Sequence, residues 1–95
     1  MTAAEILTMT KVNLELPASN TLFDDYIMKL IEAAEQMIAR EGIVLTDTVE
    51  DGNIVTMYAA YLYRKRANDS PVMPRMLRYA LNNRLFSQKV GEADA

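Results

Sequence analysis

Residues 54–63 constrain the fold of this chain more than any other feature. Every residue in this run except Thr56 is apolar or aromatic, and three cations follow directly at 64–66. The run is too short to cross a bilayer, and a helix without a polar face is buried on several sides. We therefore expect it to form the central helix of a bundle, with its tyrosines contacting water or another subunit.

Two helices are predicted before this run. Thr2 and Glu5 have the spacing of a capping box, which predicts a helix over residues 3–14. An apolar stripe with i, i+3, i+4, i+7 spacing predicts the clearest helix, over residues 22–41, with Gly42 as its left-handed C-terminal residue. The stripe comprises Ile27, Leu30, Ile31, Ala34, Met37 and Ile38, and Thr21 is the expected N-cap.

Two further helices follow in the chain. One, over residues 51–66, holds the apolar run, and residues 46–48 offer its cap. The other begins after Pro74, because proline is tolerated in a first helical turn, and residues 88–95 are expected to form a flexible tail. The apolar face of this last helix is expected to comprise Met73, Met76, Leu77, Ala80, Leu81 and Leu85, with Arg75, Arg78 and Lys89 on the other side.

The chain has 95 residues, a length typical of one domain. The helical pattern assigns residues 1–95 to the all-α class, as a small bundle of about four helices with a core over residues 3–87. Because Cys and His are absent, a disulfide, a Cys/His zinc site and a Ser-His-Asp triad are excluded. The acidic pairs at 24–25 and 50–51 are adjacent residues, which do not share a helix face, so we expect them to be favourable N-terminal helix charges. We expect no catalytic, cofactor-binding or metal site and no enzymatic activity.

Charge is distributed unevenly along the chain. Residues 1–63 carry three cations and ten anions, whereas residues 64–95 carry seven cations and three anions. An acidic and a basic surface on one subunit suit head-to-tail contact between identical copies, because one patch can meet the opposite patch of a neighbour. The alternative is that each helix presents an independently solvated charged face.

Three segments carry a distinctive combination of residues. The third predicted helix ends in Tyr-Leu-Tyr-Arg-Lys-Arg at 61–66, and the fourth contains Met-Pro-Arg-Met-Leu-Arg-Tyr-Ala-Leu-Asn-Asn-Arg at 73–84. Together with Leu-Ile-Glu-Ala-Ala-Glu at 30–35, they resemble the head–tail connector family of tailed phages. The resemblance covers residues 3–86, although the 42–50 connection is shorter than in many members of that family.

The resemblance implies a structural role in the virion neck, with assembly in the host cytoplasm. Such proteins form rings of identical subunits, expected here to be dodecameric, beneath the portal protein of the filled head. Neck or tail-completion proteins bind the other side of the ring. Genomic DNA passes through without specific binding. The resemblance implies no enzymatic residues and no cofactor, and no membrane contact is expected.

Contacts between subunits are expected to combine two kinds of residue. Aromatic anchors supply affinity, whereas exposed ion pairs are worth about 0–1 kcal/mol each and set the register. We hypothesise that acids of the second helix face Arg75, Arg78 or Arg84 of the next copy. The candidate subunit or portal interface comprises Asp25, Glu32, Glu35, Tyr58, Tyr61, Arg64, Arg66, Arg75, Arg78, Tyr79 and Arg84.

Two alternative functions remain open on sequence alone. A small helical DNA-binding module is one, because cations surround the junction of the last two helices in an outline similar to a helix-turn-helix. Against it, the sequence pI is about 4.8 and the junction contains two prolines. The other alternative is a small regulatory helical dimer, which would show no tendency to form rings.

Overall fold

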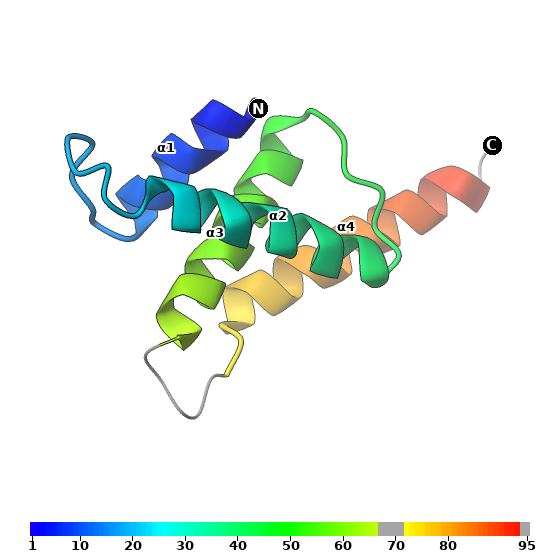
Figure 1. Cartoon of the computed structure of the whole chain (residues 1–95). Coiled ribbons are helices and arrows are strands. Elements are labelled where there is room, and N and C mark those ends of the chain that lie inside the picture. The colour runs from blue at the N-terminus through cyan, green and yellow to red at the C-terminus, as the bar shows by residue number, and fades with distance from the viewer. Residues whose placement is uncertain (67–71, 94–95) are drawn as a thin grey trace.

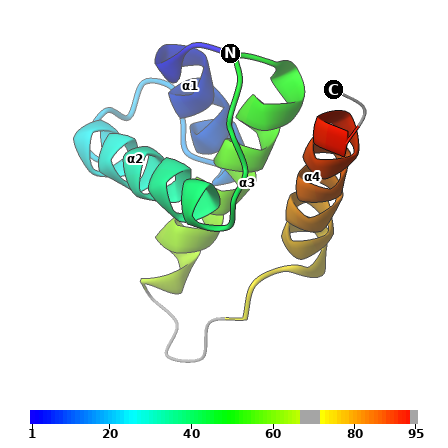
Figure 2. The ribbon, with the colours of Figure 1, turned by 90° about the vertical axis from the view of Figure 1, so that its right-hand side faces the viewer.

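The computed structural model describes residues 1–66 and 72–93, which fold into four helices. In chain order these are α1 (Ala3–Asn13), α2 (Asp24–Arg40), α3 (Val49–Lys65) and α4 (Arg75–Ala93) (Figure 1). Both ribbon views place α3 in the middle, with α1 and α4 on opposite sides of it (Figure 1, Figure 2). The prediction of a small all-α bundle is confirmed, and no strand occurs within the described ranges.

Local capping explains where three helices begin or end. Thr2 and Glu5 form the predicted capping box at the start of α1. At the start of α3 the hydroxyl of Thr48 accepts a hydrogen bond from the Asp51 backbone N–H at 3.2 Å. Gly42, with a φ of 95°, adopts the predicted left-handed conformation after α2.

The prediction that Thr21 is the N-cap of α2 is wrong. The helix begins at Asp24, so Phe23 occupies the N-cap position and offers no side-chain oxygen. The carbonyl of Thr21 instead accepts a hydrogen bond from the Asp24 N–H at 3.2 Å. Residues 21–23 therefore form a turn that leads into the helix.

The core is formed mainly where α2 and α3 cross. All fully buried positions of α2 belong to its predicted apolar stripe, which confirms that interpretation. The central position of α3 is also confirmed, because its buried side chains lie on several sides of the helix. The core comprises Ile27, Ile31, Ala34 and Ile38 from α2, Ile54, Val55, Tyr58 and Ala59 from α3, and Ile6, Ile43, Leu77 and Leu81 from elsewhere.

The structure of α4 corrects two predictions. The helix continues to Ala93, so the expected flexible tail over 88–95 is helical as far as that residue, while 94–95 lie outside the described part of the chain. Met76 is 75% exposed and does not join the apolar face. It precedes the buried Leu77 and so lies about 100° around the helix from it.

Candidate interaction surface

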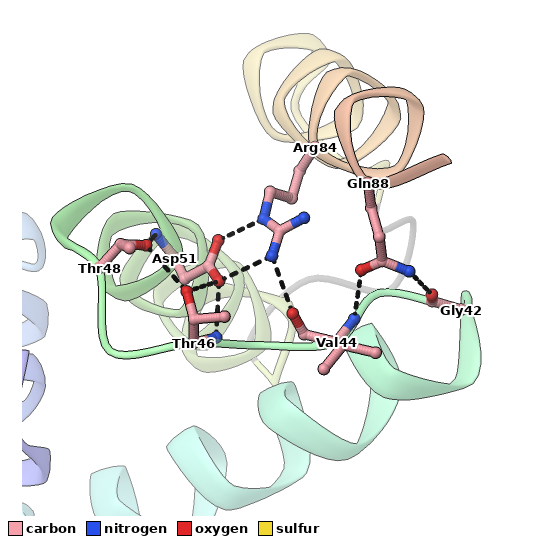
Figure 3. Close-up of polar contacts among 7 residues, drawn as sticks. All are labelled: Gly42, Val44, Thr46, Thr48, Asp51, Arg84 and Gln88. Carbon is pink, nitrogen blue, oxygen red and sulfur yellow. Dashed lines mark hydrogen bonds and ion pairs between the residues drawn. The ribbon is translucent and has the colours of Figure 1, made fainter. Parts of the chain in front are cut away.

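A polar clamp holds α4 against the rest of the molecule (Figure 3). Its centre is the ion pair between Asp51 of α3 and Arg84 of α4, with Nε 2.6 Å from Oδ1. Asp51 is 1% exposed, and the Arg84 side chain is 13% exposed. Arg84 Nη2 also donates to the other carboxylate oxygen at 3.1 Å and to the Val44 carbonyl at 2.8 Å.

The same clamp binds the connection between α2 and α3. Thr46 donates to Asp51 Oδ2 from its backbone N–H at 2.7 Å and from its hydroxyl at 2.9 Å. One turn beyond Arg84, the Gln88 amide accepts from the Val44 N–H at 2.7 Å and donates to the Gly42 carbonyl at 2.8 Å. These bonds satisfy backbone groups that no helix or strand satisfies.

The charged groups of the clamp already have hydrogen-bond partners within the chain, which suits a structural role. Burial alone would raise the pKa of Asp51, but the hydrogen bonds from Arg84 and Thr46 outweigh it and hold this pKa below its usual value. The bond to Asp51 likewise raises the pKa of Arg84. Both carboxylate oxygens already accept hydrogen bonds, so Asp51 is poorly placed to act on a ligand or to exchange protons near neutral pH.

Four of the predicted interface cations have partners within the same chain. Arg84 belongs to the clamp, and Arg78 pairs with Glu41. Arg64 donates to the Asn13 carbonyl at the end of α1 at 2.8 Å. Arg66 lies 4.3 Å from the ring centroid of Tyr63 and 6.0 Å from that of Tyr26. Their first role is thus to join helices of one copy.

The remaining predicted interface residues divide into buried and exposed groups. Tyr58 is a core residue, and burial raises the pKa of its hydroxyl, so its prediction as a surface anchor is wrong. Tyr61 is half-buried, with its ring centroid 6.0 Å from that of Tyr58. The exposed candidates are Asp25, Glu32 and Glu35 on α2, and Arg75 and Tyr79 on α4.

Lys11 has a role that the sequence analysis did not assign. This lysine is buried against α2, where its ammonium lies 2.9 Å from Asp24 Oδ1. It also donates to the Ala18 carbonyl at 3.2 Å, which ties the loop between α1 and α2 to both helices. As a result, the exposed face of α1 carries no lysine or arginine.

An apolar stripe covers the exposed side of α4, on which the buried Leu77 and Leu81 do not lie. Met76, Tyr79, Phe86 and Val90 are 75%, 58%, 70% and 44% exposed. With Asn83 they repeat at intervals of three and four residues, the spacing of a helix face that packs against another helix. We call these five residues the outer face of α4. The sequence signal for the outer face of α4 was that apolar residues occur on both sides of the predicted fourth helix. Periodicity alone, however, assigned Met76 to the core.

A second exposed apolar region lies between α1 and α3. It is an open groove of about 370 Å³, which we call the α1–α3 groove. A smaller depression of about 170 Å³ shares Met57 and Asn13 with the groove and extends it to Met76 at the start of α4. The groove is lined by Met9, Val12, Asn13, Asn53, Thr56 and Met57.

Neither the outer face of α4 nor the lining of the α1–α3 groove includes an acidic side chain. Residues 1–66 and 72–93 contain no cluster of three or more acidic side chains able to hold a metal ion. None of the helices in these ranges is long and apolar enough to cross a membrane. The geometry of both regions instead suits contact with another protein surface.

Comparison with known proteins returned no match to any family model, curated protein or solved structure. The resemblance to head–tail connectors therefore depends on the segments at 30–35, 61–66 and 73–84.

Proposed function

We propose that the protein is a structural assembly subunit of the head–tail connector kind. In this proposal identical copies form a ring, a dodecamer in the virion neck, between the portal protein and neck or tail-completion proteins. The single observation that carries the proposal is the outer face of α4, a row of large apolar side chains left in water by the fold. The largest exposed apolar patch of a typical monomer measures about 300–600 Å² and is often functional.

The distribution of polar groups also supports a structural role. The densest polar cluster of the described residues is the clamp, whose carboxylate and guanidinium are used to hold α4. Catalysis generally requires titratable groups that converge on an accessible pocket with perturbed pKa values. Here the buried carboxylate with a perturbed pKa, that of Asp51, accepts hydrogen bonds from Arg84 and Thr46.

A DNA-binding function is less well supported by the same geometry. Protein–DNA affinity comes largely from lysine and arginine contacts to phosphates. Four of the arginines around the junction of α3 and α4 already contact groups within their own chain: Arg64, Arg66, Arg78 and Arg84. Passage of DNA through a ring without specific binding is compatible with the net charge of −3.

Native mass spectrometry of the purified chain across a concentration series is the direct test. The measurement is made on the chain alone and again with the portal protein encoded in the same genome. A ring species, formed either alone or only with the portal protein, is the expected result. A strict monomer or dimer that ignores the portal protein would contradict the proposal, and salt-dependent binding of duplex DNA would favour the alternative function.

A further inference from the structure

We propose that the outer face of α4 in one copy docks into the α1–α3 groove of a second copy. This inference rests on the proposed function and deepens it, because it names the two surfaces that join neighbouring subunits. The occupant of the groove is thus a segment of the same chain, and each copy offers one surface of each kind.

The outer face has the form of a helix-docking seam. Its residues follow the 3–4 spacing that keeps side chains in line along a partner. Asn83 interrupts the apolar row at its centre, and a single polar residue at such a position favours one register over others. Phe86 and Tyr79 are the candidate anchors, because large aromatic side chains contribute most to interface energies.

The α1–α3 groove provides a complementary receptor. Two methionines, Met9 and Met57, line the groove. Methionine side chains are flexible and adapt their shape to an incoming surface. Asn13 and Asn53 also line the groove, where either amide could pair with Asn83 of the incoming helix. An apolar floor with a few polar groups is typical of grooves that accept an amphipathic helix.

Charge favours this pairing over contact between two α4 helices. The exposed charges on α1 and on the loop just after it are the anions Glu5 and Glu15, because Lys11 is turned inward. The outer face of α4 is flanked by the exposed cations Arg75 and Lys89. Two α4 faces would bring like charges together, whereas α4 against α1 brings opposite charges together.

Within one copy, Met76 is the member of the outer face that borders the groove, through the smaller depression. Tyr79, Phe86 and Val90 line neither the groove nor this depression, and α1 and α4 lie on opposite sides of α3 (Figure 2). Docking of these three residues into the groove therefore needs a second copy. The contact is therefore heterologous, and such a contact closes into a ring when the rotation between copies fits.

The size of the contact predicts that a single junction is weak. The apolar side chains of the outer face expose on the order of 400 Å², about half of the roughly 800 Å² that each partner contributes to a standard interface. Closure of a ring would strengthen the assembly, because the last junctions form within one particle. Assembly should therefore depend steeply on protein concentration.

The absence of cysteine from the chain allows a clean cross-linking test. We would prepare the full chain with Val12→Cys, with Ser87→Cys and with both, and treat each with a short bismaleimide. Ser87 is exposed and follows the anchor Phe86, which stays in place. Gln36→Cys, at an exposed polar position of α2, is the matched control. The expected result is a Val12→Cys/Ser87→Cys heterodimer when the single variants are mixed, and a ladder of oligomers from the double variant.

Three other outcomes would overturn the inference. Cross-linking of Ser87→Cys to itself in preference to Val12→Cys would indicate that α4 pairs with α4. Rings in native mass spectra without cross-links above the Gln36→Cys level would place the junction elsewhere and leave the proposed function intact. Neither rings nor cross-links at any concentration, with or without the portal protein, would overturn both proposals.

A second variant tests the same surface without cross-linking. Phe86→Glu places a charge within the apolar row and is expected to weaken self-association by about tenfold or more, as loss of an interface anchor does. Gln36→Glu on α2 is its control, and circular dichroism should show the same helix content in both. Equal self-association of the two variants would contradict the inference.

Discussion

Replacement of Asp51 by Asn tests how much the clamp contributes to folding. The variant removes the charge that faces Arg84 but keeps the size of the side chain. Of the acceptors contacted by Arg84, whose side chain is 13% exposed, the Val44 carbonyl is then the one that stays unchanged, while an amide with one acceptor oxygen replaces the carboxylate. Breaking a buried ion pair by removing one partner costs about 3–5 kcal/mol. Because Arg84 keeps one acceptor and some contact with water, we expect a loss at the lower end, about 3 kcal/mol.

Urea denaturation at pH 7, followed by far-ultraviolet circular dichroism, measures this loss. With an m-value of about 1 kcal/mol per molar urea, the midpoint should fall by about 3 M. A domain of this length has an unfolding free energy on the order of 5–15 kcal/mol, so the variant should still fold in water.

Glu32→Gln is the matched control for Asp51→Asn. It removes the charge of an exposed pair, with Lys29 Nζ 3.4 Å from the carboxylate, and should cost at most about 0.5 kcal/mol. A loss of less than about 1 kcal/mol for Asp51→Asn would refute the reasoning, because the clamp would then contribute no more than a surface pair. Arg84→Met, alone and combined with Asp51→Asn, completes a double-mutant cycle, which should show favourable coupling between the two side chains.

Three further predictions concern local features. The pKa of Asp51 is lower in the folded than in the unfolded chain. Its contribution to the free energy of unfolding is therefore complete above the unfolded pKa of about 3.9 and is lost as pH falls through the folded pKa. The urea midpoint should accordingly fall more steeply in acid for the wild type than for Asp51→Asn. Gly42→Ala should cost about 1–2 kcal/mol because its φ is 95°, whereas Gly91→Ala, on an open helical position, should stabilise by about 0.5–1 kcal/mol; thermal unfolding of the two variants would reveal the opposite signs. Thr48→Ala should lose about 1 kcal/mol with its cap bond to Asp51, and an unchanged urea midpoint would show that this cap is dispensable.

The candidate interaction surface could be predicted only in part from the sequence. Tyr79 and Arg75 were correctly placed on the surface, since both lie away from the apolar residues 77 and 81 on a helical pattern. Tyr58 was misassigned because α3 is apolar all round, so periodicity does not indicate which tyrosine faces the core. Met76 was misassigned because it lies at the border between two apolar faces of α4.

The helices themselves were determined by local sequence. Thr2 with Glu5, Thr48 and Gly42 fix ends of α1, α3 and α2 through bonds or backbone angles that involve only a few neighbouring residues. The apolar stripe of α2 likewise determined which of its sides is buried. These caps and this stripe depend on residues that are close together in the chain, so they can be predicted from the sequence.

The roles of the charged residues were decided by tertiary structure. Asp51 and Arg84 are 33 residues apart, and their pairing depends on how α4 crosses the connection between α2 and α3. The same holds for Lys11, which is buried only because α2 places Asp24 beside it. Charge is long-range and lacks the periodicity of apolar burial, so a sequence shows how many charges a chain carries but not which of them remain at its surface.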